Sequence, residues 1–533
     1  MPEIDTDVII VGAAPTGLML AAELRLAGVR TRVLERLTEP DAVTKAGGLG
    51  GQILDLLRHR GLLERFESAS GQPRPAPRFP FGGLHVDLTQ LADSPMQALL
   101  LPQPRMESLL EDIADERGAE IRRGHDVTGL SQDAEKVTVD VRAPAGPYRL
   151  TARYLVGCDG VHSRVRDMAG IGFPGITYPD VHRLGAFAMP DSVTLLDDGD
   201  YEIAGLGRVR AGYTQTPHGI FAISSYTGDD LGLYTSEERD ASYDDETPMT
   251  LAEFEASVRR VLGVSIPLSE PTRLTRFIYS ARQADRYRAG RIVVAGDAAH
   301  QFPSGGVAVN AGMLDSVNLA WKLGAEIGGW APDGLLDSYH DERHFAGART
   351  LLHTQAQVAL RRGLDPAADA LREIVSELFL DEPAQQRIGA LIAGADLRYP
   401  MPDPAPHALA GTFASDLDLH SDLDLHSDLD LHDARPVFLD LADRADLREI
   451  VEHWRHRVDV RAARPDDRPA DALLVRPDAY IAWGATVDEP PDVAAPALRE
   501  ALTHWFGAPA VSCRSTEGPL HTRTSQIVSR AAR

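Results

Sequence analysis

The sequence predicts an α/β protein with a Rossmann-like nucleotide-binding domain at its N-terminus, an inserted and mostly antiparallel β-sheet, and a small C-terminal α/β domain. Three observations predict this fold class. The chain opens with a strand, a glycine turn, a helix and a second strand, its middle is rich in turn glycines and scattered aromatics, and its last part alternates short apolar strands with helices. At 533 residues the chain is also too long for one hydrophobic core, so two or three domains are expected.

The opening unit follows from its hydrophobic periodicity. Residues 7–11 are a β-branched run that stops at Gly12, as a buried parallel strand does. Residues 15–27 carry leucines at helical spacing, and residues 31–34 form a second short strand. Strand, turn, helix and strand in this order make a βαβ unit. Two further helices are expected at 51–66 and 106–117.

The middle of the chain changes character. Residues 176–275 contain many turn glycines and few helical patterns, which predicts an antiparallel sheet that serves as a substrate platform. A strand at 291–295 and a helix after Asn310 return to the character of the first domain. The nucleotide-binding domain is therefore expected to be discontinuous, over 1–175 and 276–395.

The hexapeptide Ser-Asp-Leu-Asp-Leu-His occurs three times between 415 and 432. In an extended chain its even period would place Asp and His on one face, where a divalent metal would find ligands. We favour the alternative, a solvated linker over 396–435, and predict no metal site. A small α/β domain at 436–513 and a loose tail at 514–533 complete the chain.

Composition excludes several classes of function. The net charge of −25, from 54 basic and 79 acidic residues, would repel nucleic acid and anionic membranes. The most apolar early stretch, 8–20, is interrupted by Gly12, Pro15 and Gly17, so neither a signal peptide nor a membrane span is expected. The two cysteines, Cys158 and Cys513, form no CxxC pair, which fits a reducing, cytoplasmic compartment.

The first glycine turn reads Gly12-Ala13-Ala14-Pro15-Thr16-Gly17. A dinucleotide turn needs Gly-x-Gly-x-x-Gly for the tight turn, the close approach of the pyrophosphate and the packing of helix on strand. Here Ala14 stands where the second glycine belongs. Glu35, at the end of the second strand, is placed to accept a ribose hydroxyl. An ordinary βα turn with a surface glutamate is the alternative.

Three further motifs follow in order. Cys158-Asp159-Gly160 through Arg164 resembles the Asp-Gly motif of flavoprotein hydroxylases, Gly296-Asp297 through His300 resembles their Gly-Asp motif, and Gln103-Pro-Arg105 resembles a segment that contacts the flavin's ribityl and phosphate portion. Together with the first turn, they resemble the class A flavin monooxygenases of the p-hydroxybenzoate hydroxylase fold. The chain is most similar to the hydroxylases of aromatic polyketides such as angucyclines and anthracyclines.

The resemblance implies a fold and a chemistry. The first domain would be an FAD-binding domain of the glutathione reductase type, and the last a thioredoxin-like domain without redox activity. FAD would be the cofactor, NADPH a transient reductant, and O2 the source of one oxygen atom for an aromatic polyketide in antibiotic biosynthesis, by hydroxylation or Baeyer–Villiger insertion. The family includes monomers and homodimers.

The resemblance also implies a set of cofactor-binding positions. In chain order these are Gly12, Ala14, Pro15, Thr16, Gly17, Glu35, Arg36, Lys45, Gln103, Arg105, Val127, Asp159, Gly160, Gly296, Asp297, Pro303, Gly305, Gly306, Val307, Ala308, Val309 and Asn310. No catalytic residue is identified; His300 and Lys45 are the candidates, because each is titratable and falls near the expected flavin position. A structural hydrogen bond is the alternative role for His300.

The departures from the family pattern cluster at the flavin. Besides Ala14, the chain has Val307 and Ala308 where the family has Gln and Gly, Lys45 for Arg, and Gln52 for a second Arg. They suggest altered flavin handling, or neutral drift in a working hydroxylase. A second hypothesis follows from them: a catalyst of dehydration or cyclisation, or a binding protein, that keeps the polyketide pocket without using flavin.

Overall fold

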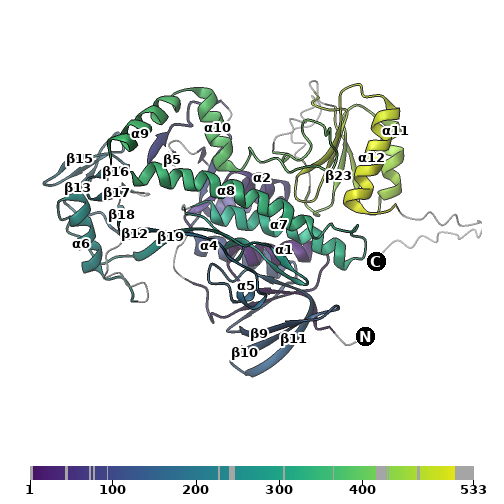
Figure 1. Ribbon diagram of the computed structural model, residues 1–533, viewed down its shortest axis with the longest axis horizontal. Coiled ribbons are helices and arrows are strands. Elements are labelled where there is room, and N and C mark those ends of the chain that lie inside the picture. Colours follow the sequence, from purple (N-terminus) through teal and green to yellow (C-terminus); the bar gives the residue numbers. More distant parts are fainter. Residues whose placement is uncertain are drawn as a thin grey trace, which may run out of the picture.

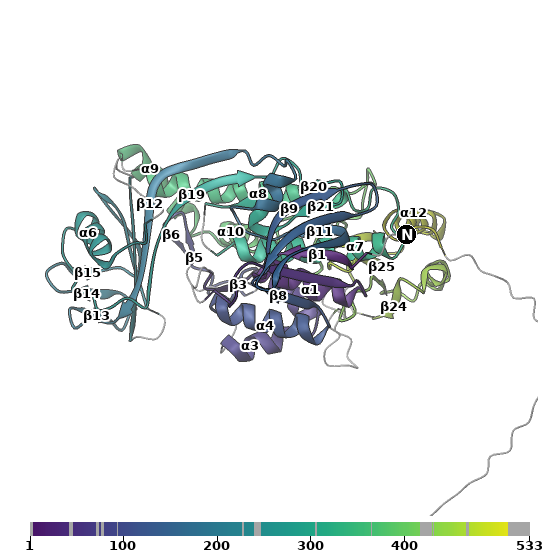
Figure 2. The same cartoon turned by 90° about the horizontal axis from the view of Figure 1, so that it is seen from below.

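The computed structural model describes residues 4–41, 46–70, 74–75, 79–92, 94–225, 229–238, 247–303, 306–363, 365–415, 429, 431–464 and 468–509. Three parts lie in a row: the antiparallel sheet at one end, the nucleotide-binding domain in the middle and the C-terminal domain at the other end (Figure 1, Figure 2). This arrangement agrees with the predicted fold class.

The middle part is built on a sheet with the order β20-β21-β11-β1-β2-β8. Its strands are β1 (Thr6–Val11), β2 (Thr31–Glu35), β8 (Glu120–Arg123), β11 (Gly146–Gly157), β20 (Arg288–Ala289) and β21 (Ile292–Val294), extended beside β11 by β10 (Val137–Ala143) and β9 (Asp126–Gln132). β1 pairs in parallel with β2 and β11, and its Val8, Ile9 and Ile10 are fully buried. A strand that is apolar on both faces needs cover on both faces, which explains the continuous apolar run.

Helices pack around this sheet and against one another. They are α1 (Pro15–Leu26), α2 (Gln52–His59), α3 (Leu63–Ser70), α4 (Gln103–Glu116), α5 (Arg164–Met168), α7 (Ala308–Ile327), α8 (Ser338–Arg362), α9 (Pro366–Leu378) and α10 (Glu382–Ala393), with the short strands β3 (Gly48–Gly50), β4 (Arg74–Pro75), β5 (Phe79–Phe81), β6 (Leu84–Val86) and β7 (Gln97–Leu100) between them. The prediction of one helix over 51–66 is wrong. Gly61 adopts φ +66°, and a Cβ there would lie 2.7 Å from His432 Nε2, so the chain turns between α2 and α3.

The prediction of a mostly antiparallel middle sheet is confirmed. Its order is β16-β17-β18-β12-β19-β22, formed by β12 (Gly175–Ala188), β16 (Gly212–Thr216), β17 (Gly219–Ser224), β18 (Asp230–Glu238), β19 (Arg273–Gln283) and β22 (His300–Gln301). A smaller sheet of β13 (Val193–Leu195), β14 (Tyr201–Ile203) and β15 (Gly207–Val209) lies beside it. Helix α6 (Leu251–Leu262) covers one face, where Phe254 packs on Phe187 and Glu253 accepts from Arg183.

The C-terminal part contains a mixed sheet of order β24-β23-β25-β26. Its elements are β23 (Val437–Asp440), α11 (Ala445–Val451), η2 (Glu452–Trp454), β24 (Asp459–Ala462), β25 (Ala472–Val475), β26 (Ile481–Ala485) and α12 (Pro491–Phe506). Short strands alternate with helices as expected, and α11 and α12 pack on the sheet, in agreement with the thioredoxin-like expectation.

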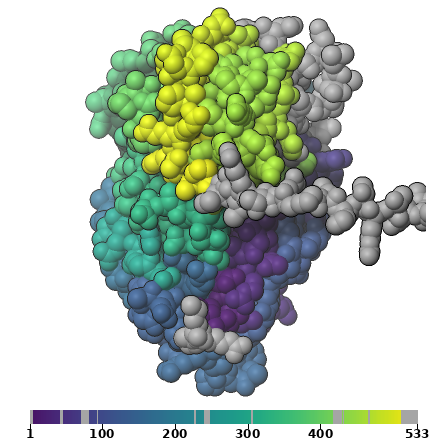
Figure 3. Space-filling view, turned by 90° about the vertical axis from the view of Figure 1, so that its right-hand side faces the viewer, coloured from purple at the N-terminus to yellow at the C-terminus, as the bar shows by residue number. Residues whose placement is uncertain are grey.

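A buried ion cluster joins the C-terminal part to the middle. Arg476 lies with its guanidinium 2.6 Å from both Glu342 of α8 and Asp478, and Glu342 also accepts from Lys322 of α7 at 2.8 Å. All four side chains are buried. On the face shown in Figure 3 the C-terminal domain, yellow to green, sits directly on the teal surface of the middle part. Removing one partner of such a cluster would leave an uncompensated buried charge, so the two parts fold as one structure.

The expected domain limits stay predictions. Of the repeat, residues 416–428 and 430 lie outside the described residues, as do most of the predicted tail and Cys513. At its end Leu429 and Leu431 are buried, and Leu431 accepts a hydrogen bond from Arg60. Among the described helices, none is both long and apolar enough to cross a bilayer.

Candidate functional site

The turn between β1 and α1 is closed by backbone contacts. Gly12 has φ +107°, and a Cβ there would lie 2.3 Å from the carbonyl oxygen of Cys158. A Cβ on Gly17 would lie 2.0 Å from the carbonyl oxygen of Gly12. Ala14 differs, because its φ of −87° is open to every L-residue. The two outer glycines are therefore structural requirements, and the middle position is not.

Helix α1 begins without a side-chain cap. Its N-cap residue Ala14 makes no capping hydrogen bond, Pro15 occupies the first turn, and that turn carries no acidic residue. Its first amide groups therefore have no side-chain acceptor, and the positive end of the helix dipole faces the turn. Such a terminus suits a phosphate group.

A cavity of about 200 Å³ opens at the carboxyl ends of β1 and β2. Of the predicted cofactor positions, its lining includes Gly12, Ala14, Glu35, Arg36, Gln103, Val127, Asp159 and Gly160. The Glu35 carboxylate accepts from the backbone N–H of Ala13 at 2.9 Å and of Leu37 at 2.8 Å. A carboxylate has further lone pairs, so Glu35 keeps acceptor capacity for a diol in the cavity.

Asp159 holds the turn that begins α5. Its carboxylate accepts from the Ser163 hydroxyl and from the backbone N–H of Val165 at 3.1 Å, while Ser163 caps α5 by accepting from Arg166 N–H at 3.0 Å. Burial raises the pKa of Asp159. This residue type at this spacing thus fixes the loop that carries Gly160, at φ +83°, along the cavity wall.

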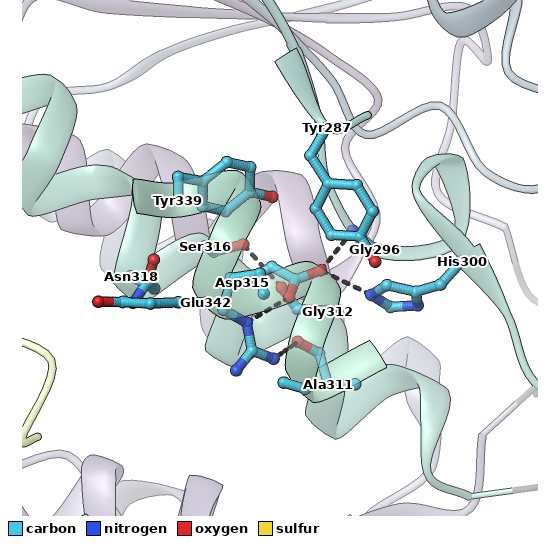
Figure 4. Close-up of polar contacts among 12 residues, drawn as sticks. Tyr287, Gly296, His300, Ala311, Gly312, Asp315, Ser316, Asn318, Tyr339 and Glu342 are labelled. Carbon is cyan, nitrogen blue, oxygen red and sulfur yellow. Dashed lines mark hydrogen bonds and ion pairs between the residues drawn. The ribbon is translucent and has the colours of Figure 1, made fainter. Parts of the chain in front are cut away.

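The second half of the predicted site is anchored from behind by Asp315 (Figure 4). Its fully buried carboxylate accepts from His300 Nε2 at 2.7 Å, from Gly296 N–H at 3.0 Å and from Arg343 Nε at 2.6 Å. Burial alone would raise the pKa of Asp315, but His300 and Arg343 lower it. His300, a catalytic candidate from sequence, is therefore engaged in joining η1 (Gly296–Ala298) to α7.

Thr16 packs α1 against this half. A Cβ on Gly296 would lie 2.6 Å from Thr16 Oγ1, and one on Gly312 would lie 2.4 Å from the same atom. The Ser316 hydroxyl of α7 donates to the Thr16 carbonyl at 2.8 Å. Two glycines that are both distant from Thr16 in sequence therefore leave room for its side chain. As a result, the Gly-Asp motif packs against the first turn.

The N-terminus of α7 forms part of a second cavity, of about 60 Å³. Val307 and Asn310 line it together with Gly50, Gln52 and Arg343. Asn310 donates to the Gly306 carbonyl at 2.8 Å and accepts from Gly50 N–H at 3.2 Å. Val307 makes no capping hydrogen bond and the first turn of α7 holds no acidic residue, so among the described residues the first amides of a second helix have no side-chain acceptor.

Some predicted positions lie elsewhere. Lys45 and Gly305 fall outside the described residues. Arg105 and Asp297 are exposed and are not among the residues lining these two cavities. Ala308 is the first residue of α7, where an added Cβ fits the helical backbone, so the expected distortion by that methyl group is not seen.

The face of the antiparallel sheet opposite α6 is aromatic, and sequence reasoning named none of its residues. His182, Tyr234 and Tyr279 come together there from three strands, with ring centroids 4.1 Å apart for His182 and Tyr279 and 5.8 Å apart for His182 and Tyr234. Arg361, from the end of α8, lies over the Tyr279 ring and donates to the Pro303 carbonyl at 3.2 Å. The aromatic face and the loop before α7 thus meet at Pro303.

Comparison with known families matches nearly the whole chain. Residues 5–354 match the family described as FAD binding domain, and residues 407–509 match aromatic-ring hydroxylase, C-terminal. The first match alone covers more than half of the chain.

Individual relatives agree. A 12-dehydrotetracycline 5-monooxygenase/anhydrotetracycline 6-monooxygenase of Streptomyces rimosus is 40% identical, over 95% of this chain and 99% of its own length. A rifampicin monooxygenase of Streptomyces venezuelae is 37% identical over 94% and 99%. A dialkyldecalin synthase of Streptomyces rugosporus is 34% identical over 94% and 99%.

Solved structures show the same pattern. The anhydrotetracycline hydroxylase OxyS of Streptomyces rimosus superposes with a TM-score of 0.83 at 38% identity, covering 95% of this chain and 100% of that one. CabE, an aromatic hydroxylase from angucycline biosynthesis, gives 0.82 at 35% with the same coverage. The Diels-Alderase PyrE3 of pyrroindomycin biosynthesis gives 0.77 at 32%, again with that coverage.

Proposed function

The chain belongs to the FAD-dependent aromatic-ring hydroxylases, which are flavin monooxygenases, and from this membership we propose that it inserts one oxygen atom of O2 into an aromatic polyketide during antibiotic biosynthesis. The observation that carries the proposal is the meeting of two surfaces at Pro303. On one side lies the FAD-binding half with its two uncapped helices, and on the other the aromatic face of the sheet.

The residues present fit FAD. The uncapped first turn of α1 and the closely packed Gly12 suit the pyrophosphate, and Glu35 suits a ribose diol. The free amides at the start of α7 suit the electron-rich edge of a reduced ring system. When bound, FAD supplies the redox and oxygen chemistry, with NADPH as the proposed reductant.

The protein's own contribution is positioning and exclusion of water. The Asp315 network holds the Gly-Asp motif and α7 at fixed distances, so the amides at the start of α7 are placed before any ligand arrives. The aromatic face offers the half-buried Tyr279 for contact with a fused-ring substrate. An enzyme of this kind would act in the cytoplasm, as a monomer or a homodimer.

A second candidate function is a non-redox cyclisation on the same scaffold. It is favoured by the similarity to a dialkyldecalin synthase and a Diels-Alderase, together with the departures at Ala14, Gln52, Val307 and Ala308. The described departures do not distort the backbone, because Ala14 and Ala308 occupy ordinary conformations. We therefore place oxygen insertion first.

The test is spectroscopic. The purified full chain, with added FAD, should show a saturable visible flavin band that bleaches with NADPH and returns with O2. In isotopically labelled O2, a polyhydroxylated anthraquinone or tetracyclic substrate should gain one labelled oxygen atom. If the protein binds flavin but oxidises NADPH with none of the substrates tested, the monooxygenase proposal is contradicted and the cyclisation function is favoured.

A further inference from the structure

A third cavity lies under the aromatic face of the antiparallel sheet, between the sheet and the end of α8. Its volume of about 10 Å³ is that of a single water molecule. His182, Tyr234, Ser236, Tyr279 and Arg361 are among its lining residues. The space is therefore too small for a ring system and suited to one oxygen atom that projects from a ring.

His182 lines this cavity, and one of its ring nitrogens has no hydrogen-bond partner among the described residues. Its side chain is only 5% exposed, its Nδ1 lies 2.6 Å from the Tyr234 hydroxyl, and its Nε2 has no hydrogen-bond partner among the described residues. A buried polar atom without a partner costs free energy, so a native site that keeps one has a use for it.

The proton positions follow from the neighbours. Burial raises the pKa of Tyr234 well above its ordinary value, so its phenol keeps its proton. The hydrogen-bond partner of that phenol is His182 Nδ1, and we assign the phenol proton to this bond. The ring proton of a neutral His182 then resides on Nε2, which becomes a hydrogen-bond donor.

His182 stays neutral in this setting. Burial, followed by the nearby cation Arg361 and then Arg183 and Arg362, lowers the pKa of His182 to about 3. The two other charged groups at the cavity, Asp180 and Arg362, are paired with each other at 2.5 Å. Arg183 points to the opposite face, where it is paired with Glu237 and Glu253.

Arg361 leaves the cavity electropositive. It is 7% exposed, it donates to the Pro303 carbonyl, it lies over the Tyr279 ring, and none of the ion pairs in the described part of the chain includes it. A buried guanidinium without a carboxylate attracts an anionic oxygen. One N–H donor and one uncompensated cation therefore face the same small space.

We propose that His182, with Arg361 beside it, binds a single ionised oxygen of the aromatic substrate, and so selects rings that carry a phenolate or enolate oxygen at the edge held against the sheet. Stabilising a phenolate makes the ring more electron-rich, which favours attack by an electrophilic oxygen. His182 is a specificity-determining residue in this role. The proposal rests on the proposed function in taking the substrate to be aromatic, but binding tests it without turnover.

The probes are 1-hydroxyanthraquinone, which changes colour when its hydroxyl ionises, and unsubstituted anthraquinone. The FAD-loaded full chain should bind the hydroxylated probe about tenfold or more tightly than the plain one, because a hydrogen bond to a charged group is the difference. The bound hydroxyl should also ionise at a lower pH than in solution. His182→Phe should lose this discrimination, and His182→Gln, which restores an N–H near the Nε2 position, should recover most of it.

His218→Phe is the matched control, since His218 is exposed in the turn between β16 and β17. Should His182→Phe fail to fold, Tyr234→Phe carries the test: it keeps the ring but releases Nδ1, and should reduce the discrimination by about threefold or more. Equal binding of both probes by the unmodified protein, or equal weakening of both by His182→Phe, would overturn the proposal.

Oxygen insertion measured on the same samples separates the two proposals. If the protein discriminates between the two probes but inserts no oxygen, the monooxygenase proposal is contradicted and the oxygen subsite is supported. Oxygen insertion without discrimination would overturn the subsite alone.

Discussion

Helices α1 and α7 both begin with free amides, yet the protein holds their N-termini in different ways. The turn before α1 is held by backbone contacts so close that Gly12 and Gly17 admit no Cβ. Just before the start of α7 there is no such contact: a Cβ on Gly306 would meet no described atom within 4 Å. Instead, α7 is held from behind through the buried carboxylate of Asp315. One terminus is positioned by shape and the other by charge.

The difference teaches where sequence change is tolerated. At α1 only Ala14 departs from the glycine pattern, and its backbone has an ordinary φ. At α7 two departures, Val307 and Ala308, are half-buried and begin the helix without distorting it. These three departures leave the backbone in ordinary conformations, which favours retained FAD binding over its loss, whereas Gln52 is buried with its amide nitrogen unpaired among the described residues.

The strongest way to break the comparison is Asp315→Asn, which keeps the shape and removes the charge. We expect a loss of about 3–5 kcal/mol in the free energy of unfolding, because Arg343 keeps a buried charge without its carboxylate. Chemical denaturation measures it, with the exposed Asp333→Asn as control. A loss below about 1 kcal/mol would show that charge does not hold α7.

The same network predicts a pH dependence. The pKa of Asp315 is lowered in the folded protein, so its contribution to stability is present above the unfolded value of about 4 and is lost as pH falls through the folded value. Denaturation midpoints of the unmodified protein should therefore fall more steeply in acid than those of Asp315→Asn. Parallel acid profiles would contradict this linkage.

Gly12→Ala tests whether close backbone packing holds the turn before α1. Left-handed strain and the contact with Cys158 should together cost roughly 2–5 kcal/mol and abolish FAD retention. Gly306→Ala is the matched comparison, because its φ of +89° carries strain without a clash, and about 1–2 kcal/mol is expected. Equal losses for the two variants would erase the difference between the two termini.

Glu35→Ala should leave the fold intact and weaken FAD binding by about tenfold or more, since a charged acceptor for the ribose is removed. Flavin fluorescence titration measures it. Unchanged affinity would remove Glu35 from the cofactor site.

The smallest effect is expected for Ala14→Gly. Removing one methyl group from the cavity wall should raise FAD affinity by less than about threefold, because closer approach of the pyrophosphate is gained at the cost of a more flexible helix start. The same titration resolves it, and weaker binding would show that the methyl group contributes to the site.

The parts predicted from sequence are those encoded locally. The βαβ unit, the antiparallel character of the middle and the four C-terminal strands follow from periodicity over a few residues. The break at Gly61 is also local, because a glycine at φ +66° with the Leu62 N–H on the Leu57 carbonyl ends a helix, but the apolar spacing on both sides favoured one continuous helix. The pairing of Asp315 with Arg343, by contrast, has no local signature.

The aromatic face shows the same limit at the candidate site. His182, Tyr234 and Tyr279 are brought together by strand register in the folded sheet, where His182 pairs with Ser236 and Phe277. Motifs revealed the nucleotide turn because one short segment forms it. A substrate surface built from one residue per strand offers no such segment to recognise.

Arg476 has a consequence for engineering. Its guanidinium is enclosed by two carboxylates and by the rings of Trp321, Trp505 and Tyr480, and these partners come from both sides of the domain junction. A chimaera that exchanged the C-terminal domain would have to place a cation at the position of Arg476. Without it, the buried Glu342 would have only Lys322 as its positively charged partner. The C-terminal domain is therefore not a detachable module, and grafts or truncations belong at exposed turns rather than at this seam.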